Sequence, residues 1–322
     1  MRIVYYIILV DQNKMSIKSF LVKKIIEWKE SSWLLGICEN GFDDLKSGTI
    51  HWIDNGIYEG RKWFADPFIL DYNENVVRLL VEEFDYQVHR GRIARLVIDR
   101  NKWVVTDCSI LLDIDTHLSF PMIWKEGETV YVCPENYHSG GWNIYRYDDT
   151  SSRLEYVKQV SYEKLTDATI FFDGTSYWLL STYEPRPNGS ELTIWKSKDL
   201  YGPYVESQKV KFIENVGRNA GMIFKYGEKM IRPAQESNHQ YGHSISFQKV
   251  SVNDGKFVFT EIYRFNTPHK KYDAGTHTYN QHINGMAVLD AKGYRYNFMG
   301  RIINTLFSIA VMVGLKNLPV LK

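Results

Sequence analysis

Residues 63–70 read WFADPFIL, with the polar Asp66 at the start of an apolar run, and related stretches recur about every fifty residues. The further copies are 118–124 (LSFPMIW), 165–172 (LTDATIFF), 217–224 (GRNAGMIF) and a weaker one at 275–279 (GTHTY). The steps between Asp66, Pro121, Asp167, Asn219 and His277 are 55, 46, 52 and 58 residues. A repeat of this length with several strands per unit is typical of a β-propeller. The first strand of every blade lines the central channel, so these polar residues are predicted to converge on one site.

Each repeat continues with a turn and further strands. In the first repeat we expect strands at 66–70, 76–83 and 91–99. The turns of the next three repeats, at 125–128, 173–176 and 225–228, each contain a glycine, which supplies positive φ at little cost. Five units counted from Asp66 predict an all-β, five-bladed β-propeller, and we expect a strand from the N-terminal region to close its first blade. The predicted domains are a lead-in (1–60), the propeller (61–295) and a C-terminal tail (296–322).

The two ends of the chain have patterns of their own. The lead-in reads as mixed α/β, with strands at 4–10, 33–38 and 51–53 and a helix at 14–29, whose apolar residues fall on one face. The start of the chain lacks the cleavage site of a signal peptide. Residues 302–315 are apolar, lie between Arg301 and Lys316 and are expected to form a helix, but they are fewer than the roughly twenty residues that a bilayer requires. This helix either packs against the domain, or lies at a membrane surface or docks a partner protein.

Composition narrows the function. The 39 Lys and Arg nearly balance the 38 Asp and Glu, which argues against nucleic acid as a partner. The 22 Tyr, 16 Phe and 9 Trp suit strands, and some can stack on sugar rings. Three cysteines without a CxxC pair indicate a reducing compartment, so we expect a cytoplasmic protein, at most peripheral to the inner face of the membrane.

The stretch Ala65–Phe68 (ADPF) resembles the first-blade motif of the five-bladed glycosidases of glycoside hydrolase families 43 and 32. That resemblance implies that Asp66 is the general base or nucleophile. Asp167, followed by ATIF, resembles their third-blade strand, in which a second aspartate tunes pKa values and holds the sugar. The glutamic acid that serves these enzymes as general acid is expected at the mouth of the fourth blade, where this sequence has Arg218 and Asn219.

The order of nine short motifs resembles a second group more closely, the N-terminal propeller domain of the glucosamine inositolphosphorylceramide transferase family. The motifs are FADPF (64–68), SFP (119–121), PEN (134–136), DAT (167–169), GP (202–203), RNAG (218–221), RPAQE (232–236), YG (241–242) and GTHT (275–278). This resemblance covers about residues 60–290. Stand-alone bacterial relatives often occur in settings of surface polysaccharide synthesis. In plant members a glycosyltransferase domain follows the propeller, whereas this sequence ends at Lys322, so the resemblance does not by itself carry over a transferase activity.

The candidate site residues follow from the repeats and the two resemblances. The catalytic candidates are Asp66, Asp167, Glu135 and Glu236, with Glu184 as a further acid. The substrate-binding candidates are Trp63, Arg218, Arg232, Gln235, Tyr241 and His277. Arginine binds carboxylate or phosphate in a bidentate fork, so the two arginines are expected to read an anionic group on a saccharide or glycolipid. The histidines show no metal-ligand spacing, and we expect neither a metal nor a cofactor.

Two functions remain open at this point. The first is a glycan-active enzyme, hydrolytic or transferring, in which Asp66 acts as base, Asp167 modulates it, and Glu135 or Glu236 acts as acid. The second is a non-catalytic carbohydrate-binding module that has lost the general acid, which the Arg218–Asn219 replacement favours. A fold alone does not decide between them.

Overall fold

The computed structural model describes residues 24–25, 27–253 and 255–312. The chain divides into two units, residues 33–291 and a terminal unit of residues 1–32 with 292–322. The expected strand at 4–10 lies outside the described residues, as does most of the expected helix at 14–29. Of that helix, residues 24–25 and 27–29 are described and are helical.

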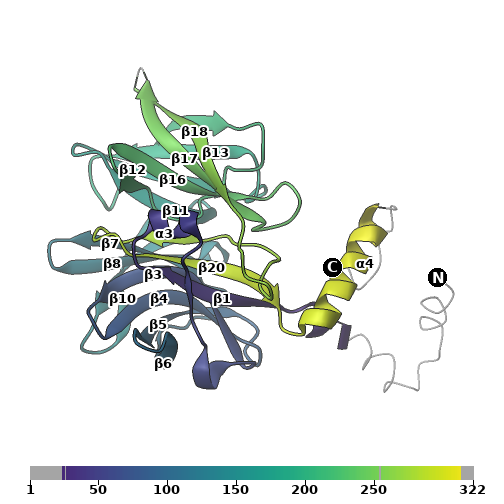
Figure 1. The fold of residues 1–322 in the computed structure, drawn as a ribbon. Coiled ribbons are helices and arrows are strands. Elements are labelled where there is room, and N and C mark those ends of the chain that lie inside the picture. The colour runs from purple at the N-terminus through teal and green to yellow at the C-terminus, as the bar shows by residue number, and fades with distance from the viewer. Residues whose placement is uncertain (1–23, 26, 254, 313–322) are drawn as a thin grey trace, which may run out of the picture. The chain divides into compact units, whose positions relative to one another are not determined.

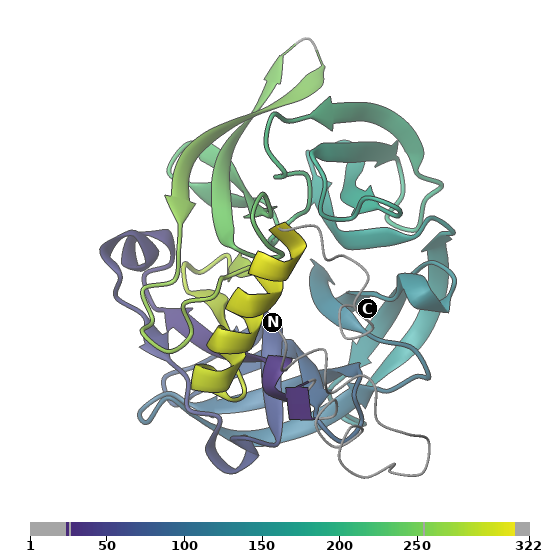
Figure 2. The ribbon, with the colours of Figure 1, turned by 90° about the vertical axis from the view of Figure 1, so that its right-hand side faces the viewer.

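The larger unit is built from five four-stranded sheets, which follow one another around a ring in chain order (Figures 1 and 2). This confirms the predicted five-bladed propeller. Blade one contains β3 (Lys62–Tyr72), β4 (Val76–Asp85), β5 (Gly91–Asp99) and β6 (Val104–Leu112). Blade two contains β7 (Ser119–Glu126), β8 (Thr129–Glu135), β9 (Trp142–Asp148) and β10 (Arg153–Ser161). Blade three contains β11 (Leu165–Phe172), β12 (Tyr177–Tyr183), β13 (Glu191–Ser197) and β14 (Val205–Lys211), and blade four contains β15 (Phe224–Tyr226), β16 (Lys229–Glu236), β17 (Ser244–Asn253) and β18 (Lys256–Phe265).

Blade five joins the two ends of the propeller sequence. Its strand order is β19 (Tyr279–Gln281), β20 (Ala287–Tyr294), β1 (Ser31–Cys38) and β2 (His51–Trp52). The expectation that an N-terminal strand closes the first blade was therefore wrong. Blade one draws all four strands from consecutive sequence, whereas the fifth repeat supplies only two strands and takes its outer pair from the N-terminal side. The pairing covers edges that β20 and β1 would otherwise expose.

Short helical segments complete the described chain. Besides the helical residues 24–25 and 27–29, they are α3 (Phe42–Ser47), the 3-10 turns η1 (Gly56–Tyr58) and η2 (Tyr137–Ser139), and the C-terminal helix α4 (Asn297–Met312). Helix α4 begins five residues before the apolar stretch expected at 302–315, and residues 313–315 lie outside the described part.

The blades stack face to face, which explains why their middle strands are apolar on both sides. Val77, Leu79 and Val81 of β4 belong to one buried cluster, and Leu80 of the same strand belongs to another that reaches blades two and three. Because successive side chains of a strand point to opposite faces, β4 is buried on both. Packing between sheets thus fixes the inner strands firmly around the axis.

A bulge recurs near the start of the inner strands of blades one to three. Asp66, Phe120 and Asp167 have φ of 51°, 45° and 45°, the left-handed region that non-glycine residues rarely adopt. The pairing register shifts at the same places, between Ala65 and Phe68 and at the equivalent points of β7 and β11. Phe120, rather than Pro121, is thus the residue of blade two equivalent to Asp66. Bulges of this kind re-aim side chains and are common beside functional sites.

Candidate functional site

One hydrogen-bonded network links all five blades. Asp66 of blade one accepts bonds from Thr278 Oγ1 of blade five at 2.6 Å and from the Phe120 backbone N–H of blade two at 3.0 Å. Arg218, on the blade-four segment, bonds to Asp167 of blade three. The structure therefore brings the polar residues of the sequence repeats together. We call four buried carboxyl residues of this network, together with the buried Glu82 on the strand paired with Asp66's strand, the channel cluster: Asp66, Glu82, Glu135, Asp167 and Asp290.

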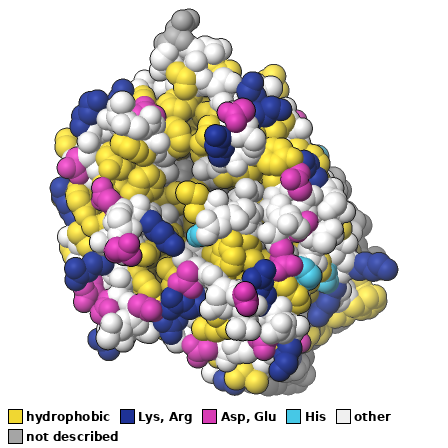
Figure 3. Space-filling model, turned by 60° about the vertical axis from the view of Figure 1, so that its left-hand side comes forward, with side chains coloured by type: hydrophobic (Ala, Val, Ile, Leu, Met, Phe, Trp, Pro, Cys, Tyr) yellow, Lys and Arg dark blue, Asp and Glu magenta, His cyan; other side chains and the backbone are white. Residues whose placement is uncertain are grey.

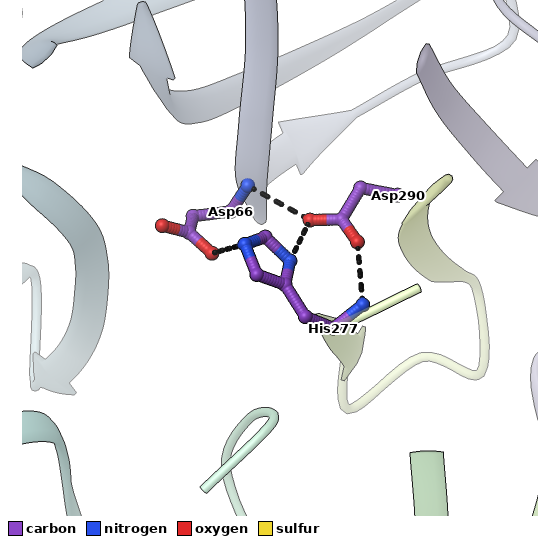
Figure 4. Close-up of side chains that lie close together, drawn as sticks. All are labelled: Asp66, His277 and Asp290. Atoms are coloured by element: carbon purple, nitrogen blue, oxygen red, sulfur yellow. Dashed lines mark hydrogen bonds and ion pairs between the residues drawn. The ribbon is translucent and has the colours of Figure 1, made fainter. Parts of the chain in front are cut away.

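Asp66, His277 and Asp290 form the first half of the cluster (Figure 4). His277 Nδ1 lies 2.7 Å from Asp290 Oδ2, and its Nε2 lies 3.7 Å from Asp66 Oδ1. Asp290 also accepts the backbone N–H of Asp66 at 3.2 Å and, through Oδ1, those of His277 and Thr278 at 3.0 and 3.1 Å. The Trp33 ring stacks on the His277 imidazole with centroids 3.9 Å apart. The imidazole is therefore fixed in position between two carboxyl groups.

These contacts shift two pKa values. Burial raises the pKa of Asp66 to about 6, although the charge of His277 pulls it down. Burial alone would lower the pKa of His277, but Asp290 and Asp66 together raise it above its ordinary value. Asp66 is thus a carboxyl group that changes charge near neutral pH, as a general base requires.

Asp167, Glu135 and Arg218 form the second half. The Arg218 guanidinium forms a bidentate ion pair with Asp167, with Nε 2.7 Å from Oδ2 and Nη2 3.2 Å from Oδ1. The same Nη2 lies 3.4 Å from Glu135 Oε2, which also accepts the Asp167 backbone N–H at 2.8 Å. Burial raises the pKa of Glu135 well above its ordinary value, despite the opposing charge of Arg218. Gln235 Nε2 donates to Asp167 Oδ2 at 2.5 Å, which completes the shell of donors around that carboxylate.

The sequence prediction missed two members of the channel cluster, Glu82 and Asp290. Both lie on the second strand of a blade. Glu82 pairs with Ala65 as Glu135 pairs with Ser119 in the next blade, and Asp290 donates its backbone N–H to Thr278. Burial, with the charge of Asp66, raises the pKa of Glu82 well above its ordinary value. Aligning the second strands as well as the first would have placed Glu82 and Glu135 at equivalent positions.

His117 is the close neighbour of Glu82. Its Nε2 lies 3.2 Å from Glu82 Oε1, and its Nδ1 accepts the Gly91 backbone N–H at 2.9 Å. Burial lowers the pKa of His117 to about 4, so the ring is neutral at physiological pH. Arg218 and His277 are the basic residues that contact Asp66, Glu135, Asp167 and Asp290 in the described part of the network.

Arg232 lies apart from these carboxyl groups. Its fully buried guanidinium donates to Asn219 Oδ1 at 2.9 Å, to Gln248 Oε1 at 2.8 Å and to the backbone carbonyls of Val216 and Gly217. Burial lowers its pKa to about 9. These bonds tie the blade-four segment to β16 and β17, and they occupy each nitrogen of the guanidinium.

Glu236 holds a loop. Its carboxylate accepts the Asn238 backbone N–H at 2.7 Å and contacts His243 Nδ1 at 2.8 Å and Ser244 Oγ at 3.0 Å. Burial opposes ionisation, but these hydrogen bonds hold the pKa of Glu236 below its ordinary value. Glu184 lies just after β12, and its backbone N–H donates a hydrogen bond to the Lys164 carbonyl.

Two aromatic candidates lie beside the cluster. The Tyr241 ring is 5.1 Å from Arg218 Cζ and meets the His277 ring edge-on at 5.4 Å. Burial raises the pKa of Tyr241 well above its ordinary value, so it stays a neutral hydrogen-bonding group. Trp63 stacks on Phe84 at 4.7 Å with nearly parallel rings, within an apolar group that includes Trp33 and Tyr241.

Asp66, His277 and Asp290 can also be considered as metal ligands, because one ligand atom from each lies within 4.8 Å of the others. Each oxygen of Asp290, however, already accepts two N–H groups of the protein. A cation would have to displace the His277 proton from Asp290. The geometry therefore fits a hydrogen-bonded triad better than a cation site.

Two open clefts lie elsewhere on the propeller. One, of about 720 Å³, lies between blades one and two and is lined by Asp71, Arg78, Lys125 and Arg146 among others. The other, of about 480 Å³, is lined by residues of the 196–207 segment. Neither cleft is lined by a residue of the channel cluster. The chemistry of the cluster, with its buried acids of raised pKa, makes it the stronger candidate site.

The model of the family described as glucosamine inositolphosphorylceramide transferase 1, N-terminal, matches residues 54–293. The chain belongs to this family. The predicted resemblance is thereby confirmed, and the match takes in all five residues of the channel cluster.

Individual relatives agree with the family match. The chain is 29% identical over 199 residues to glucosamine inositolphosphorylceramide transferase 1 of Arabidopsis thaliana, covering 59% of this chain and 26% of that protein. It is 29% identical over 198 residues to the protein of the same name from Oryza sativa subsp. japonica, covering 58% and 26%. The chain thus spans about a quarter of the length of these curated relatives.

Among solved structures, the propeller is similar to the Bacteroides ovatus xyloglucan PUL GH43B protein. The TM-score is 0.50 at 11% identity, over 68% of this chain and 50% of that one. At this identity the likeness shows the fold alone. It agrees with the predicted kinship in fold to the five-bladed glycosidases.

Proposed function

We propose that this glycan-related propeller protein binds a saccharide or glycolipid at the channel cluster and acts on it. Membership of a transferase-named family and the glycosidase-like fold support the substrate class. The observation that carries the proposal is the contrast between two halves of one buried network. The pKa of Asp66 is about 6 beside His277, whereas burial raises the pKa of Glu135 well above its ordinary value beside the Arg218–Asp167 pair.

This contrast supplies an acid and a base. With a pKa of about 6, Asp66 is mostly ionised at neutral pH and can accept a proton. Glu135, whose pKa is well above its ordinary value, can donate one. In hydrolysis Glu135 would protonate the glycosidic oxygen as the carbon–oxygen bond breaks, and Asp66 would take the proton of the attacking water. In transfer, a sugar hydroxyl would take the place of that water.

The ligand we propose is uncharged or carries an amine. Arg218 was expected to read an anionic group, but its nitrogens bond to Asp167, Glu135 and Asn188. Arg232 is fully buried and bonded in the same way to protein oxygens. The basic groups Arg218 and His277 already bond to carboxyl oxygens of the network, so hydroxyl or ammonium donors suit it better than a phosphate or uronate.

The second candidate function is a binding module without turnover. The position expected to carry the general acid holds Arg218, whose guanidinium stays charged and cannot donate a proton as an acid does. In this version the same carboxyl groups would bind sugar hydroxyls. We propose a cytoplasmic location for either version, which the free cysteines Cys38, Cys108 and Cys133 support.

A screen of glycans and nucleotide sugars separates these alternatives. Ligands would be found by the rise in melting temperature of the wild-type protein and then incubated with it for product analysis. Cleavage or transfer that disappears in both Asp66→Asn and Glu135→Gln supports the enzyme. Binding without product supports the module. Wild-type turnover in Asp66→Asn would rule out Asp66 as the base.

A further inference from the structure

Helix α4 exposes an apolar face within the terminal unit. Phe298, Ile302 and Leu306 are 74%, 39% and 59% exposed, and their spacing of four residues places them on one side of the helix. Ile303, by contrast, is 8% exposed and lies on a buried side. Large apolar side chains gathered on one helix face are unusual unless that face meets a lipid surface or another protein.

The terminal unit is also strongly basic. Residues 1–32 and 292–322 contain eleven Lys and Arg against three Asp and Glu. The whole chain has 39 and 38, so the remaining residues 33–291 contain 28 Lys and Arg against 35 Asp and Glu. The near-neutral chain thus consists of a basic terminal unit and an acidic propeller. On the propeller face drawn in Figure 3, charges of both signs are interspersed.

Two of the three acids in the terminal unit are already paired within it. Glu30 Oε2 lies 2.6 Å from Arg295 Nη1, and Glu27 accepts from Lys24 at 2.8 Å and from the Tyr296 hydroxyl at 2.5 Å. By sequence, the unit has eight more Lys and Arg than Asp and Glu. Helix α4 itself contains Arg301 as its one charged residue, so apolar and basic character lie together in this segment.

We propose that the terminal unit docks on an anionic lipid surface, with Phe298, Ile302 and Leu306 lying among the headgroups. A segment that combines an apolar helix face with a surplus of basic residues binds such surfaces through hydrophobic and electrostatic terms together. Among the described residues, no helix has the length and apolar character needed to cross a membrane. Charge complementarity selects anionic lipid over a neutral bilayer. The proposal stands independently of the saccharide site.

Vesicle co-sedimentation of the full chain tests this. Vesicles would be phosphatidylcholine alone, or phosphatidylcholine with about 30% phosphatidylglycerol. The test variant is the double substitution Phe298→Gln with Leu306→Gln, which keeps helix propensity. The matched control is Ile213→Gln with Ile283→Gln, two apolar residues of the propeller that are at least as exposed.

The wild-type protein should sediment with anionic vesicles and stay in the supernatant with neutral ones. Affinity should fall about tenfold or more in the helix variant and stay unchanged in the control. Equal binding to neutral vesicles, or equal loss in the control, would overturn the proposal. The proposal would also be overturned if the wild-type protein bound neither kind of vesicle and eluted as a dimer, while the helix variant eluted as a monomer. A second copy of the chain would then cover this face.

Discussion

His277 Nδ1 lies 2.7 Å from Asp290 Oδ2, while the Nε2 of the same ring faces Asp66 at 3.7 Å. The imidazole therefore couples a carboxyl group of the second strand of blade five to one of the first strand of blade one. Since the first and last blades meet here, the pair also lies where the ring of sheets closes. The charge on Asp66 depends on this coupling.

Replacing Asp290 with asparagine should reverse the pKa shift of His277. Without the carboxylate, burial becomes the dominant influence and the pKa of His277 should fall below its ordinary value. Titration of the ring by NMR measures this directly. His282, whose pKa is lowered by its own burial, serves as an internal control and should not move. An unchanged His277 titration would contradict the assigned coupling.

The Asp290→Asn substitution should also change how the stability of the protein depends on pH. In the wild-type protein the raised pKa of His277 contributes stability below about pH 6.5, and this contribution is lost as pH rises through the folded pKa. In Asp290→Asn a lowered pKa should make the contribution of His277 increase with pH over the same range. Chemical denaturation of both proteins across pH 5–8, a range chosen around the ordinary pKa of about 6.5, compares the slopes.

Asp66→Asn should leave the folded protein intact and remove a pH-dependent cost. The pKa of Asp66 is raised from 3.8 to about 6, so the stability of the wild-type protein falls as pH rises between these values, by at most about 3 kcal/mol. Asparagine does not titrate, so the variant should gain stability relative to wild type from pH 4 to pH 6.5, by free energies of that order. A parallel pH profile for the two proteins would show that Asp66 is not the titrating group.

Arg218→Gln should destabilise the propeller strongly. It leaves the buried carboxylate of Asp167 without its paired cation and removes the guanidinium contact of Glu135, and breaking such a buried pair typically costs about 3–5 kcal/mol. Urea denaturation at neutral pH measures the loss. Arg264 is the control, because it pairs with Glu261 and Glu214 near the surface and its substitution by glutamine should cost under about 1 kcal/mol. Equal losses would mean that the buried pairs have no special role.

Gly36→Ala should weaken the closure of blade five. A Cβ on Gly36 of β1 would lie 2.7 Å from Ile50 Cγ2 and 3.1 Å from Leu289 Cδ2, so neighbouring side chains must shift. We expect a loss of about 1–3 kcal/mol by thermal or chemical unfolding. Gly189→Ala, whose added Cβ would approach Arg186 O to 3.2 Å, should cost less. An unchanged free energy of unfolding in Gly36→Ala would show that the packing around β1 can accommodate the added methyl group.

The sequence predicted the architecture because each repeat carries its own strand and turn signals. Asp66 and Asp167 could be placed because a local motif, repeated at the same point of each blade, fixed them. Glu82 and Asp290 could not, since they lie inside apolar second strands where one acidic residue is a weak signal. Pro121 was aligned one residue late because the bulge at Phe120 depends on backbone conformation and has no fixed residue type.

The partners of the two arginines depend on the fold and could not be predicted from the sequence. The sequence prediction gave Arg218 and Arg232 the same role, reading an anionic group of the ligand. In the fold, Arg218 reaches across to Asp167 of the neighbouring blade, whereas Arg232 bonds to groups of its own blade. Which acids and cations meet between blades depends on strand register and the ring of sheets, and neither is encoded locally.

Saccharide affinity measured by isothermal titration calorimetry tests the account most directly. The comparison is wild type, Asp66→Asn, Glu135→Gln and the surface control Glu206→Gln. We predict that a saccharide from the screen binds the wild type and the control alike, and that each of the two cluster variants loses about tenfold or more in affinity, as expected for lost hydrogen bonds to charged or buried groups. Equal affinity in all four proteins would contradict the claim that the channel cluster is the saccharide site.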